Sequence, residues 1–369
     1  MPKLNTAETT RILSIVNGLR NIGNSVELVT FFKGTLFTSE CRIDKFDFKI
    51  VSLVNFFGLI KSILKELYVY NPDIIIAHTH YPAFILSFLR KMKNKETPLV
   101  FDMHGSLINE IKMTSKKSLL YFRVPFNSFI EKIAISSSSK ILCVSRSAMY
   151  HLNQEMKINR ERMLYVPNGV DLSFFKPLKD DEKIFQLRRK FGLENKFVFG
   201  YIGRFQKWQG VDNFIRAAFL TQDEKIGFLI VGDDDSWIKG NVVKLKRVPR
   251  EEVPYYYSLC DVLVLPRPKH PATEVAAPTK FAEYTAMGKP VLVTNVGDAA
   301  KLTKKYRCGI VLPDNEPHTL KKGFYDFIGL SEHELRKMGK NSRKLAEGEF
   351  DWRKIIANLN SELIKLKKL

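Results

Sequence analysis

The chain has 369 residues, a length that predicts two domains of ordinary size. Its 45% hydrophobic and 27% charged residues are typical of a globular protein and exclude a disordered or fibrous chain. No apolar run approaches the roughly 18 residues needed to cross a bilayer, and the first residues lack the apolar core of a signal peptide. We therefore expect no membrane-spanning helix and no export signal.

The four cysteines and the net charge of +20 bear on location and partners. The cysteines lie far apart, which excludes a zinc finger or disulfide scaffold and favours the cytoplasm. Nucleic-acid motifs are missing, so we expect no nucleic-acid partner. Two interpretations of the charge stay open: an anionic membrane surface, contacted peripherally on its inner face, or a lysine-rich composition without specific meaning. Residues 112–132 mix basic and large apolar side chains, as interfacial segments and ordinary core helices both do.

In chain order, the first predicted element is a helix from about Ala7 to Leu19, ended by Gly23-Asn24. The polar residues 1–7 stand where a doubly wound domain normally has a buried strand, so we expect the true start to lie upstream of Met1. Short β-rich runs separated by helix-length segments then follow to the end of the chain. The predicted strands are 26–32, 73–78, 98–103, 140–145, 163–167, 197–203, 226–232, 261–266, 290–295 and 308–313.

This alternation predicts an α/β protein with parallel sheets covered on both faces. The segment 167–183 has two prolines, a glycine and a charged end, and we interpret it as the seam between two doubly wound, Rossmann-like domains that face each other. The predicted domains are 1–170 and 171–348, followed by a basic amphipathic helix at 349–369. Ligands of such sheets bind beyond the carboxyl ends of the strands.

The first candidate binding residue is Arg204, which follows Gly203 at the carboxyl end of the strand predicted at 197–203. A guanidinium in this position can hold diphosphate oxygens through two hydrogen bonds. A surface arginine without a ligand has the same pattern.

A second candidate group lies in the segment 274–295, where Pro278 suits the first turn of a helix and Gly288 its end. Thr279 and Glu283 are four residues apart and therefore share one helix face. The free amides of the first turn form an anion site, and Glu283 can accept hydrogen bonds from ribose hydroxyls. A solvated salt bridge is the alternative interpretation of Glu283.

These segments together resemble the family-4 retaining glycosyltransferases of the GT-B fold. The resemblance covers nearly the whole chain, and the order and spacing of its motifs are specific. The similar segments are FDMHG (101–105), VSRS (144–147), VPNGVDLSFFKP (166–177), YIGRFQKWQG (201–210), VPREEVPYYYSLCDVLVLPRP (248–268) and PTKFAEYTAMGKPVL (278–292).

The resemblance implies a role for three residues. Arg204 matches the arginine that binds the donor diphosphate in the family, and Glu283 matches the second glutamate of its E-x7-E motif, which holds the donor ribose. His104 matches a histidine of the acceptor-side domain that faces the donor sugar near the reacting carbon. A strand-end histidine that caps a backbone carbonyl is the alternative for His104.

The chain departs from the family pattern at three places. A lysine normally precedes the loop glycine where this chain has Gln209, and Lys207 is the candidate to replace it. The first glutamate of E-x7-E belongs at Val275, and Glu274 is one residue away. The small glycine pair near the donor corresponds to Asn5-Thr6.

Two segments suggest metal ligands, but we expect no metal and no cofactor. In His78-Thr79-His80, adjacent strand residues point to opposite faces and we expect no carboxylate nearby, so we interpret these histidines as structural or acceptor-lining residues. Asp233-Asp234-Asp235 resembles a D-x-D motif but follows a buried strand, where the family has Gly-Asp.

The sequence therefore predicts a retaining, metal-independent glycosyltransferase. Its expected donor is a UDP- or GDP-linked sugar, and its expected acceptor is a glycan or a lipid-linked molecule. A GT-B nucleotide-sugar epimerase and a non-enzymatic basic binding protein are the two alternatives that stay open.

Overall fold

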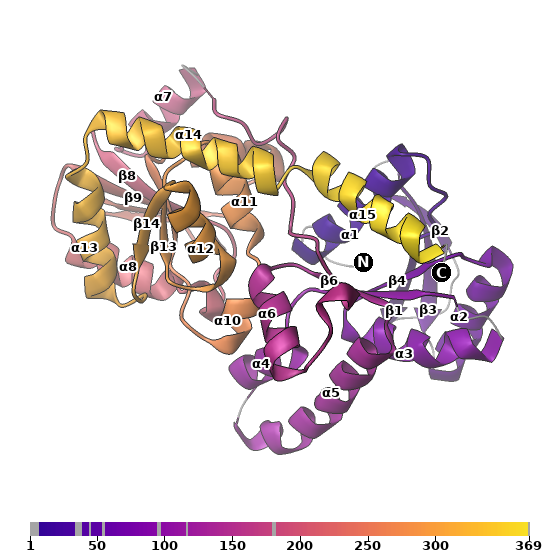
Figure 1. The fold of residues 1–369 in the computed structure, drawn as a ribbon. Helices are drawn as coiled ribbons and strands as arrows, with labels where there is room; N and C mark the ends of the chain where they lie inside the picture. Colours follow the sequence, from indigo (N-terminus) through magenta and orange to yellow (C-terminus); the bar gives the residue numbers. More distant parts are fainter. Residues whose placement is uncertain are drawn as a thin grey trace. The chain divides into compact units, whose positions relative to one another are not determined.

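The computed structural model describes residues 7–33, 39–43, 46–53, 56–93, 97–115, 117–178 and 182–367 (Figure 1). The chain forms two compact units. The first contains Met1–Val144, Met149–Val166 and Trp352–Leu369, and the second contains Ser145–Ala148 and Pro167–Asp351. The C-terminal segment that the sequence sets apart thus belongs to the first unit. Across the described residues, no helix has the length and hydropathy needed to span a membrane.

The first unit is built on two sheets. Four parallel strands lie in sequence order, and β5 is buried along its whole length because both faces of this sheet are covered. The strands of this sheet are β4 (Ile75–His78), β5 (Leu99–Met103), β6 (Lys140–Cys143) and β7 (Met163–Tyr165). A three-stranded sheet places β3 (Phe46–Leu53) between β1 (Val29–Lys33) and β2 (Ser39–Ile43). The sequence did not predict β2 and β3, because charged residues interrupt their apolar pattern.

Helices cover the four-stranded sheet on both sides (Figure 1). On one side, Ile15 and Leu19 of α1 pack with Ile356 and Leu359 of α15. On the other side, α5 packs against both α3 and α4. The helical segments of this unit are α1 (Ala7–Asn21), α2 (Phe56–Tyr70), α3 (His80–Leu89), η1 (Arg90–Lys93), α4 (Leu107–Thr114), α5 (Lys117–Ser137), η2 (Arg160–Arg162) and α15 (Trp352–Lys367), and α6 (Arg146–Glu155) runs from the second unit into the first.

The second unit has one seven-stranded sheet in the order β10-β11-β9-β8-β12-β13-β14. All neighbouring strands are parallel except β10 and β11. The strands are β8 (Phe197–Ile202), β9 (Ile226–Asp233), β10 (Trp237–Lys239), β11 (Val242–Lys246), β12 (Val262–Leu265), β13 (Val291–Thr294) and β14 (Gly309–Leu312). The structure has a strand at each of the ten places where the apolar runs predict one, and the predicted α/β fold is confirmed.

Two apolar layers enclose this sheet, because successive side chains of a strand point to opposite faces. Val198 of β8 packs with Phe281, whereas the next residue, Phe199, packs with Phe214 and Phe324. The helical segments are α7 (Glu182–Lys190), η3 (Lys207–Gln209), α8 (Val211–Leu220), η4 (Arg250–Glu252), α9 (Val253–Ser258), α10 (Pro271–Val275), α11 (Thr279–Ala286), α12 (Gly297–Tyr306), α13 (Pro317–Ile328) and α14 (Glu332–Glu349).

Candidate active site

The sheet of the second unit has a topological switch point between β8 and β12. After β8 the chain adds β9, β11 and β10 on one side, and then β12, β13 and β14 on the other. Ligands of open parallel sheets bind outside the carboxyl ends of the strands at such a point. Arg204 follows β8 and Arg267 follows β12, so an arginine stands after each of the two strands that border the switch point.

Lys280 of α11 reaches the same edge across Gly203. Gly203 has a φ of +148°, and a Cβ at this position would overlap the Cε of Lys280. A glycine is therefore required here for both conformation and space. Burial, helped by the nearby cations Arg267 and Arg204 and opposed by Glu283, lowers the pKa of Lys280 to about 8. Lys280 thus lies within electrostatic reach of both Arg204 and Glu283, which places these two predicted residues at one edge.

Arg267 is a buried cation with unused hydrogen-bonding capacity. Its side chain is 5% exposed, and one Nη donates to the carbonyls of Thr273 and Ala276 at 3.3 Å each. Among the described residues, the Nε of Arg267 and the Oε1 of Gln209 are buried polar atoms without a hydrogen-bond partner. Burial lowers the pKa of Arg267 to about 10. Because an unpaired buried donor costs about 1–3 kcal/mol, this edge is suited to an anion that would complete its hydrogen bonds.

Glu283 is anchored to the core of the second unit. Its Oε2 accepts a hydrogen bond of 2.6 Å from the hydroxyl of Tyr257. Burial raises the pKa of Glu283, while the Tyr257 hydrogen bond and the cations Arg250 and Lys280 pull it down. The carboxyl group is therefore held in a fixed position one turn inside α11.

The remaining candidates of the second unit have different surroundings. Thr279 is the first residue of α11, and Lys207 is exposed on η3 beside Gln209. Glu274 lies on α10, where its Oε2 accepts a hydrogen bond of 2.9 Å from the backbone N–H of Gly297, the first residue of α12. Asn5-Thr6 lies outside the described residues.

The three consecutive aspartates after β9 are engaged with cations. Lys244 lies 2.8 Å from Asp233 and 2.5 Å from Asp235, and Arg247 lies 3.4 Å from Asp234. Lys244 is a residue of β11, the strand that pairs with β9. The aspartates therefore form ion pairs along the sheet edge.

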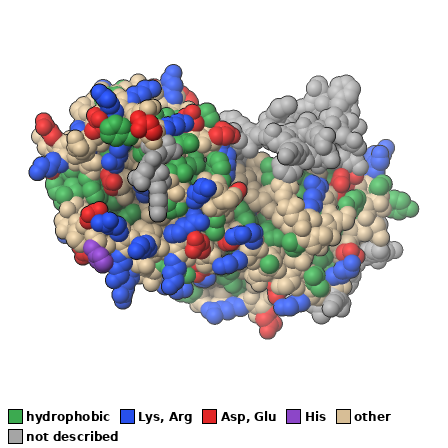
Figure 2. Space-filling model, turned by 90° about the horizontal axis from the view of Figure 1, so that it is seen from above, with side chains coloured by type: hydrophobic (Ala, Val, Ile, Leu, Met, Phe, Trp, Pro, Cys, Tyr) green, Lys and Arg blue, Asp and Glu red, His purple; other side chains and the backbone are tan. Residues whose placement is uncertain are grey.

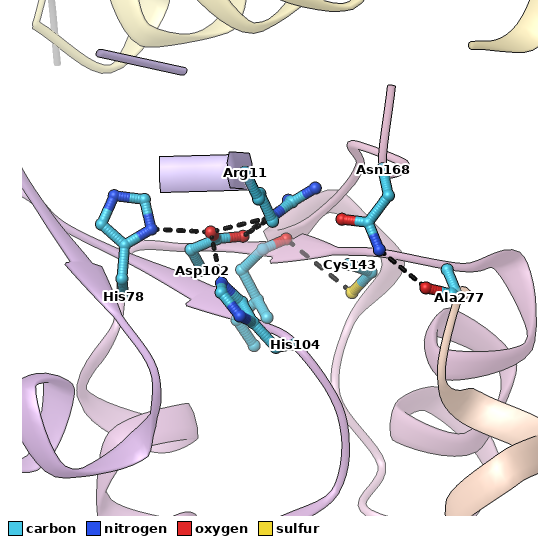
Figure 3. Close-up of polar contacts among 8 residues, drawn as sticks. Arg11, His78, Asp102, His104, Cys143, Asn168 and Ala277 are labelled. Atoms are coloured by element: carbon cyan, nitrogen blue, oxygen red, sulfur yellow. Dashed lines mark hydrogen bonds and ion pairs between the residues drawn. The ribbon is translucent and has the colours of Figure 1, made fainter. Parts of the chain in front are cut away.

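In the first unit, His78, His104 and Arg11 converge on the fully buried carboxylate of Asp102 (Figure 3). Arg11 donates to both carboxylate oxygens, with its Nη2 at 2.7 Å and its Nε at 3.0 Å. The Nδ1 of His78 and the Nε2 of His104 lie 2.7 and 2.8 Å from Oδ2. Burial acts to raise the pKa of Asp102, but Arg11 and the two histidines hold it well below its usual range.

His78, Asp102 and His104 could also be considered as metal ligands, because one potential ligand atom of each residue lies within 4.8 Å of the other two. Ligands of a tetrahedral Zn²⁺ would stand about 3.3 Å apart, given Zn–N and Zn–O bonds of about 2.0–2.1 Å. The observed distances of 2.7 and 2.8 Å are hydrogen-bond lengths instead. The guanidinium of Arg11 would also repel a metal cation, so the geometry indicates a hydrogen-bonded cluster.

His80 belongs to a neighbouring acidic group, so the expectation that no carboxylate lies near these histidines is wrong for both His78 and His80. The Nε2 of His80 lies 3.4 Å from the Oε1 of Glu131, which also accepts the N–H of Leu107 at the start of α4. Glu110 of α4 lies over Gly105, where a Cβ would overlap its Oε1. Burial and the nearby carboxylates Glu131 and Glu8 raise the pKa of Glu110, whereas His80 and His104 lower it.

Sequence reasoning missed four residues of these two edges, and each carried a signal. Asp102 stands two residues before His104, so both point to the same face. Lys280 stands three residues before Glu283 on one helix face. Arg267 follows a buried strand as Arg204 does, and Arg11 occupies an otherwise apolar helix stripe with Ile15 and Leu19.

Comparison with known proteins finds two glycosyltransferase family models that match consecutive parts of the chain. Residues 9–174 match the model "Glycosyltransferase Family 4", and residues 183–345 match the model "Glycosyl transferases group 1". An uncharacterized glycosyltransferase of Methanocaldococcus jannaschii is 23% identical over 307 residues, which are 79% of this chain and 74% of that protein.

Two further proteins are similar over most of the chain. The UDP-Gal:alpha-D-GlcNAc-diphosphoundecaprenol alpha-1,3-galactosyltransferase of Escherichia coli is 26% identical over 304 residues, covering 78% of this chain and 71% of its own. The structure of Anabaena HepE in complex with UDP superposes with a TM-score of 0.75 at 16% identity, over 99% of this chain and 98% of that one. The fold and the two family matches agree: this chain is a glycosyltransferase of the family-4 type with the GT-B fold.

Proposed function

We propose that this glycosyltransferase transfers a sugar from a nucleotide diphosphate donor to a lipid-linked or glycan acceptor, with retention of anomeric configuration and without a metal ion. The observation that carries the proposal is the group of three cations, Arg204, Arg267 and Lys280, at the switch point of the second unit. A diphosphate supplies the negative charge and the acceptor oxygens that this edge can bind.

The donor site follows from the chemistry of these groups. The diphosphate binds Arg204 and Lys280, and the ribose hydroxyls donate to Glu283, which Tyr257 orients. Gln209 lies beside this site with its Oε1 available to a ligand donor. UDP is the first nucleotide to test, because HepE is described in complex with UDP-glucose and the E. coli galactosyltransferase is named for UDP-Gal.

The difficult step is the departure of the nucleotide diphosphate. Negative charge grows on the leaving oxygens as the bond to the sugar breaks, and preorganised cations stabilise that charge. Arg204 and Lys280 perform this task, which in other enzymes falls to a divalent metal. The acceptor hydroxyl then attacks from the face that the diphosphate leaves, so the configuration is retained.

His104 is proposed to contact the donor sugar near the reacting carbon. Asp102 holds its imidazole through a hydrogen bond of 2.8 Å, and Arg11 keeps that carboxylate ionised. The acceptor side also contains Glu110 and Glu131, whose carboxyl groups are suited to binding sugar hydroxyls. We propose that the acceptor is lipid-linked, as the name of the E. coli relative states for that enzyme, and that the protein works peripherally at the cytoplasmic membrane face.

The test is a panel of UDP- and GDP-linked sugars in a thermal-shift assay with and without EDTA, followed by transfer assays. A ligand that binds only the folded protein raises its apparent stability, so the true donor should raise Tm most. Transfer should persist in EDTA, and NMR of the product should show the anomeric configuration of the donor. Isomerisation of the donor alone would point to an epimerase, and a product of inverted configuration would contradict the proposed stereochemistry.

A further inference from the structure

Helix α5 presents a stripe of exposed aromatic side chains. Phe122, Phe126 and Phe129 are 75%, 62% and 54% exposed. Their spacing of four and three residues places them on one helix face. Tyr121 is also exposed and packs edge-on against Phe122, with ring centroids 5.3 Å apart.

Helix α3 continues this apolar surface. Phe84 lies 5.9 Å from Phe129 and 5.3 Å from Phe88, measured between ring centroids, and Phe88 is itself exposed. The hydroxyl of Tyr81 donates to Asn127 of α5 at 2.6 Å, which ties the two helices together. Exposed apolar residues are ordinary when scattered, but a contiguous group of this size marks an interaction surface.

The charges around this aromatic surface have one sign. Residues 80–93 and 117–137, which form α3, η1 and α5, contain six lysines and arginines and one acidic residue, Glu131. Glu131 is buried, whereas Lys91, Arg123 and Lys132 are exposed. By contrast, the face shown in Figure 2 mixes acidic and basic side chains. Aromatic rings with cations, and without an exposed carboxylate among the described residues of α3, η1 and α5, match the apolar boundary and anionic headgroups of a membrane surface.

The opposite side of α5 contributes Glu131 to the group that also contains His80. Glu131 follows Phe129 by two residues, a rotation of about 200° around the helix. There it contacts His80 and the first amide of α4. One helix therefore connects the aromatic surface with the edge at which we place the acceptor.

We propose that the aromatic surface of α3 and α5, defined by Phe88, Phe122, Phe126 and Phe129 with the flanking Lys91, Arg123 and Lys132, docks this protein on an anionic membrane. The inference rests on the proposed function, because a lipid-linked acceptor is presented at that interface. The rings enter the headgroup boundary and the cations bind the lipid phosphates.

The experiment is co-sedimentation of the full chain with vesicles of equal parts phosphatidylcholine and phosphatidylglycerol. The wild type should bind these vesicles, bind phosphatidylcholine alone far less, and dissociate as salt screens the charges. Phe122→Ser/Phe126→Ser and Arg123→Glu/Lys132→Glu should each reduce binding by about tenfold or more. The control variants Phe185→Ser/Tyr325→Ser and Lys322→Glu/Lys337→Glu alter exposed residues of the same types in the second unit and should bind as the wild type does.

Circular dichroism and Tm of each variant show that it is folded. Equal binding by the aromatic variant and its control would overturn the proposal, and so would equal binding to neutral vesicles. A dimer in sedimentation velocity that the aromatic substitutions abolish would instead assign the surface to a second copy of the chain. Vesicle binding is measured without any transfer reaction. The thermal-shift and transfer assays with nucleotide sugars therefore test the proposed function independently of this surface.

Discussion

The carboxyl edges of the two main sheets differ in how their charges are balanced. In the first unit, the buried carboxylate of Asp102 is surrounded by Arg11 and two histidines that all bind it. In the second unit, Lys280 lies within electrostatic range of Arg204 and Arg267, while Glu283 acts on Lys280 and Glu274 on Arg267. At the first edge the protein itself pairs the buried charge. The second edge has the positive charge of an anion site and, among the described residues, one unpaired buried donor, the Nε of Arg267.

This difference separates two kinds of polar cluster. A charge that is neutralised inside the fold positions its neighbours and contributes mainly to stability. Cations that lie close together lower one another's pKa values, and such a cluster gains most when an anionic ligand binds. Substitutions in the first edge should therefore act on folding as well as on activity, and those in the second mainly on the ligand.

The largest expected effect is on stability, from Asp102→Asn. Removing this buried charge leaves Arg11 without its anionic partner, and breaking a buried pair costs about 3–5 kcal/mol of unfolding free energy. The exposed pair of Asp73 and Lys367 provides the control, since Asp73→Asn should cost about 1 kcal/mol or less. Denaturant unfolding at neutral pH measures both.

The pH dependence sharpens this prediction. Because the folded-state pKa of Asp102 lies below its unfolded value, its contribution is present above the unfolded pKa and is lost as pH falls through the folded one. The stability gap between wild type and Asp102→Asn should therefore narrow below about pH 4. A stability difference that stays constant down to acid unfolding would contradict an ionised Asp102 bound by Arg11.

The next effect is on catalysis, from Arg204→Ala. Loss of one cation that stabilises the leaving diphosphate should lower kcat by about 10²–10³. Arg216→Ala, at an exposed arginine of α8 in the same unit, should leave kcat unchanged. The loss of kcat should be the same in EDTA. Steady-state kinetics of both variants measure it, and an unchanged Tm would show that the loss does not come from unfolding. A kcat within a few-fold of the wild type would remove Arg204 from the reaction.

Glu283→Gln should act on donor affinity more than on turnover. The substitution retains the shape but weakens the hydrogen bonds to the ribose, so donor binding should fall by about 1–2 kcal/mol. Calorimetric titration with the nucleotide diphosphate measures this loss directly. The exposed Glu194→Gln is the matched control, and equal affinities in the two variants would contradict the ribose role.

The smallest effect expected is a pH dependence of donor binding. Lys280 has a pKa of about 8, so the free protein loses this cation as pH rises above that value. Affinity for the diphosphate should therefore be constant at lower pH and should fall by at most about tenfold per pH unit above it. Lys280→Arg keeps the charge and should remove the slope. An affinity that is equally flat in both proteins between neutral pH and pH 9 would show that Lys280 does not contact the ligand.

The sequence alone determined the fold class and supplied candidate residues for the second site. Continuous apolar strands in alternation with helices require parallel sheets covered on both sides, so local composition is sufficient for that prediction. Arg204 and Glu283 could be proposed from the sequence because each occupies a position that the chain specifies locally, after a strand and inside a helix. The strands β2 and β3 were missed because their charged residues interrupt the alternation of apolar and polar residues. Their hydrogen bonding to neighbouring strands, and not their sequence pattern, defines them as strands.

Only the tertiary structure decided which residues meet. Arg11 and Asp102 are 91 positions apart, and no local pattern joins a helix arginine to a strand aspartate. The side chain of Lys280 packs against Gly203, the residue before Arg204, where a glycine leaves room for it, and only three-dimensional packing shows this. The exposure of Phe122, Phe126 and Phe129 is also a fact that only the tertiary structure could show. An apolar helix face has one period whether it is covered or open, so only packing shows that this one is open.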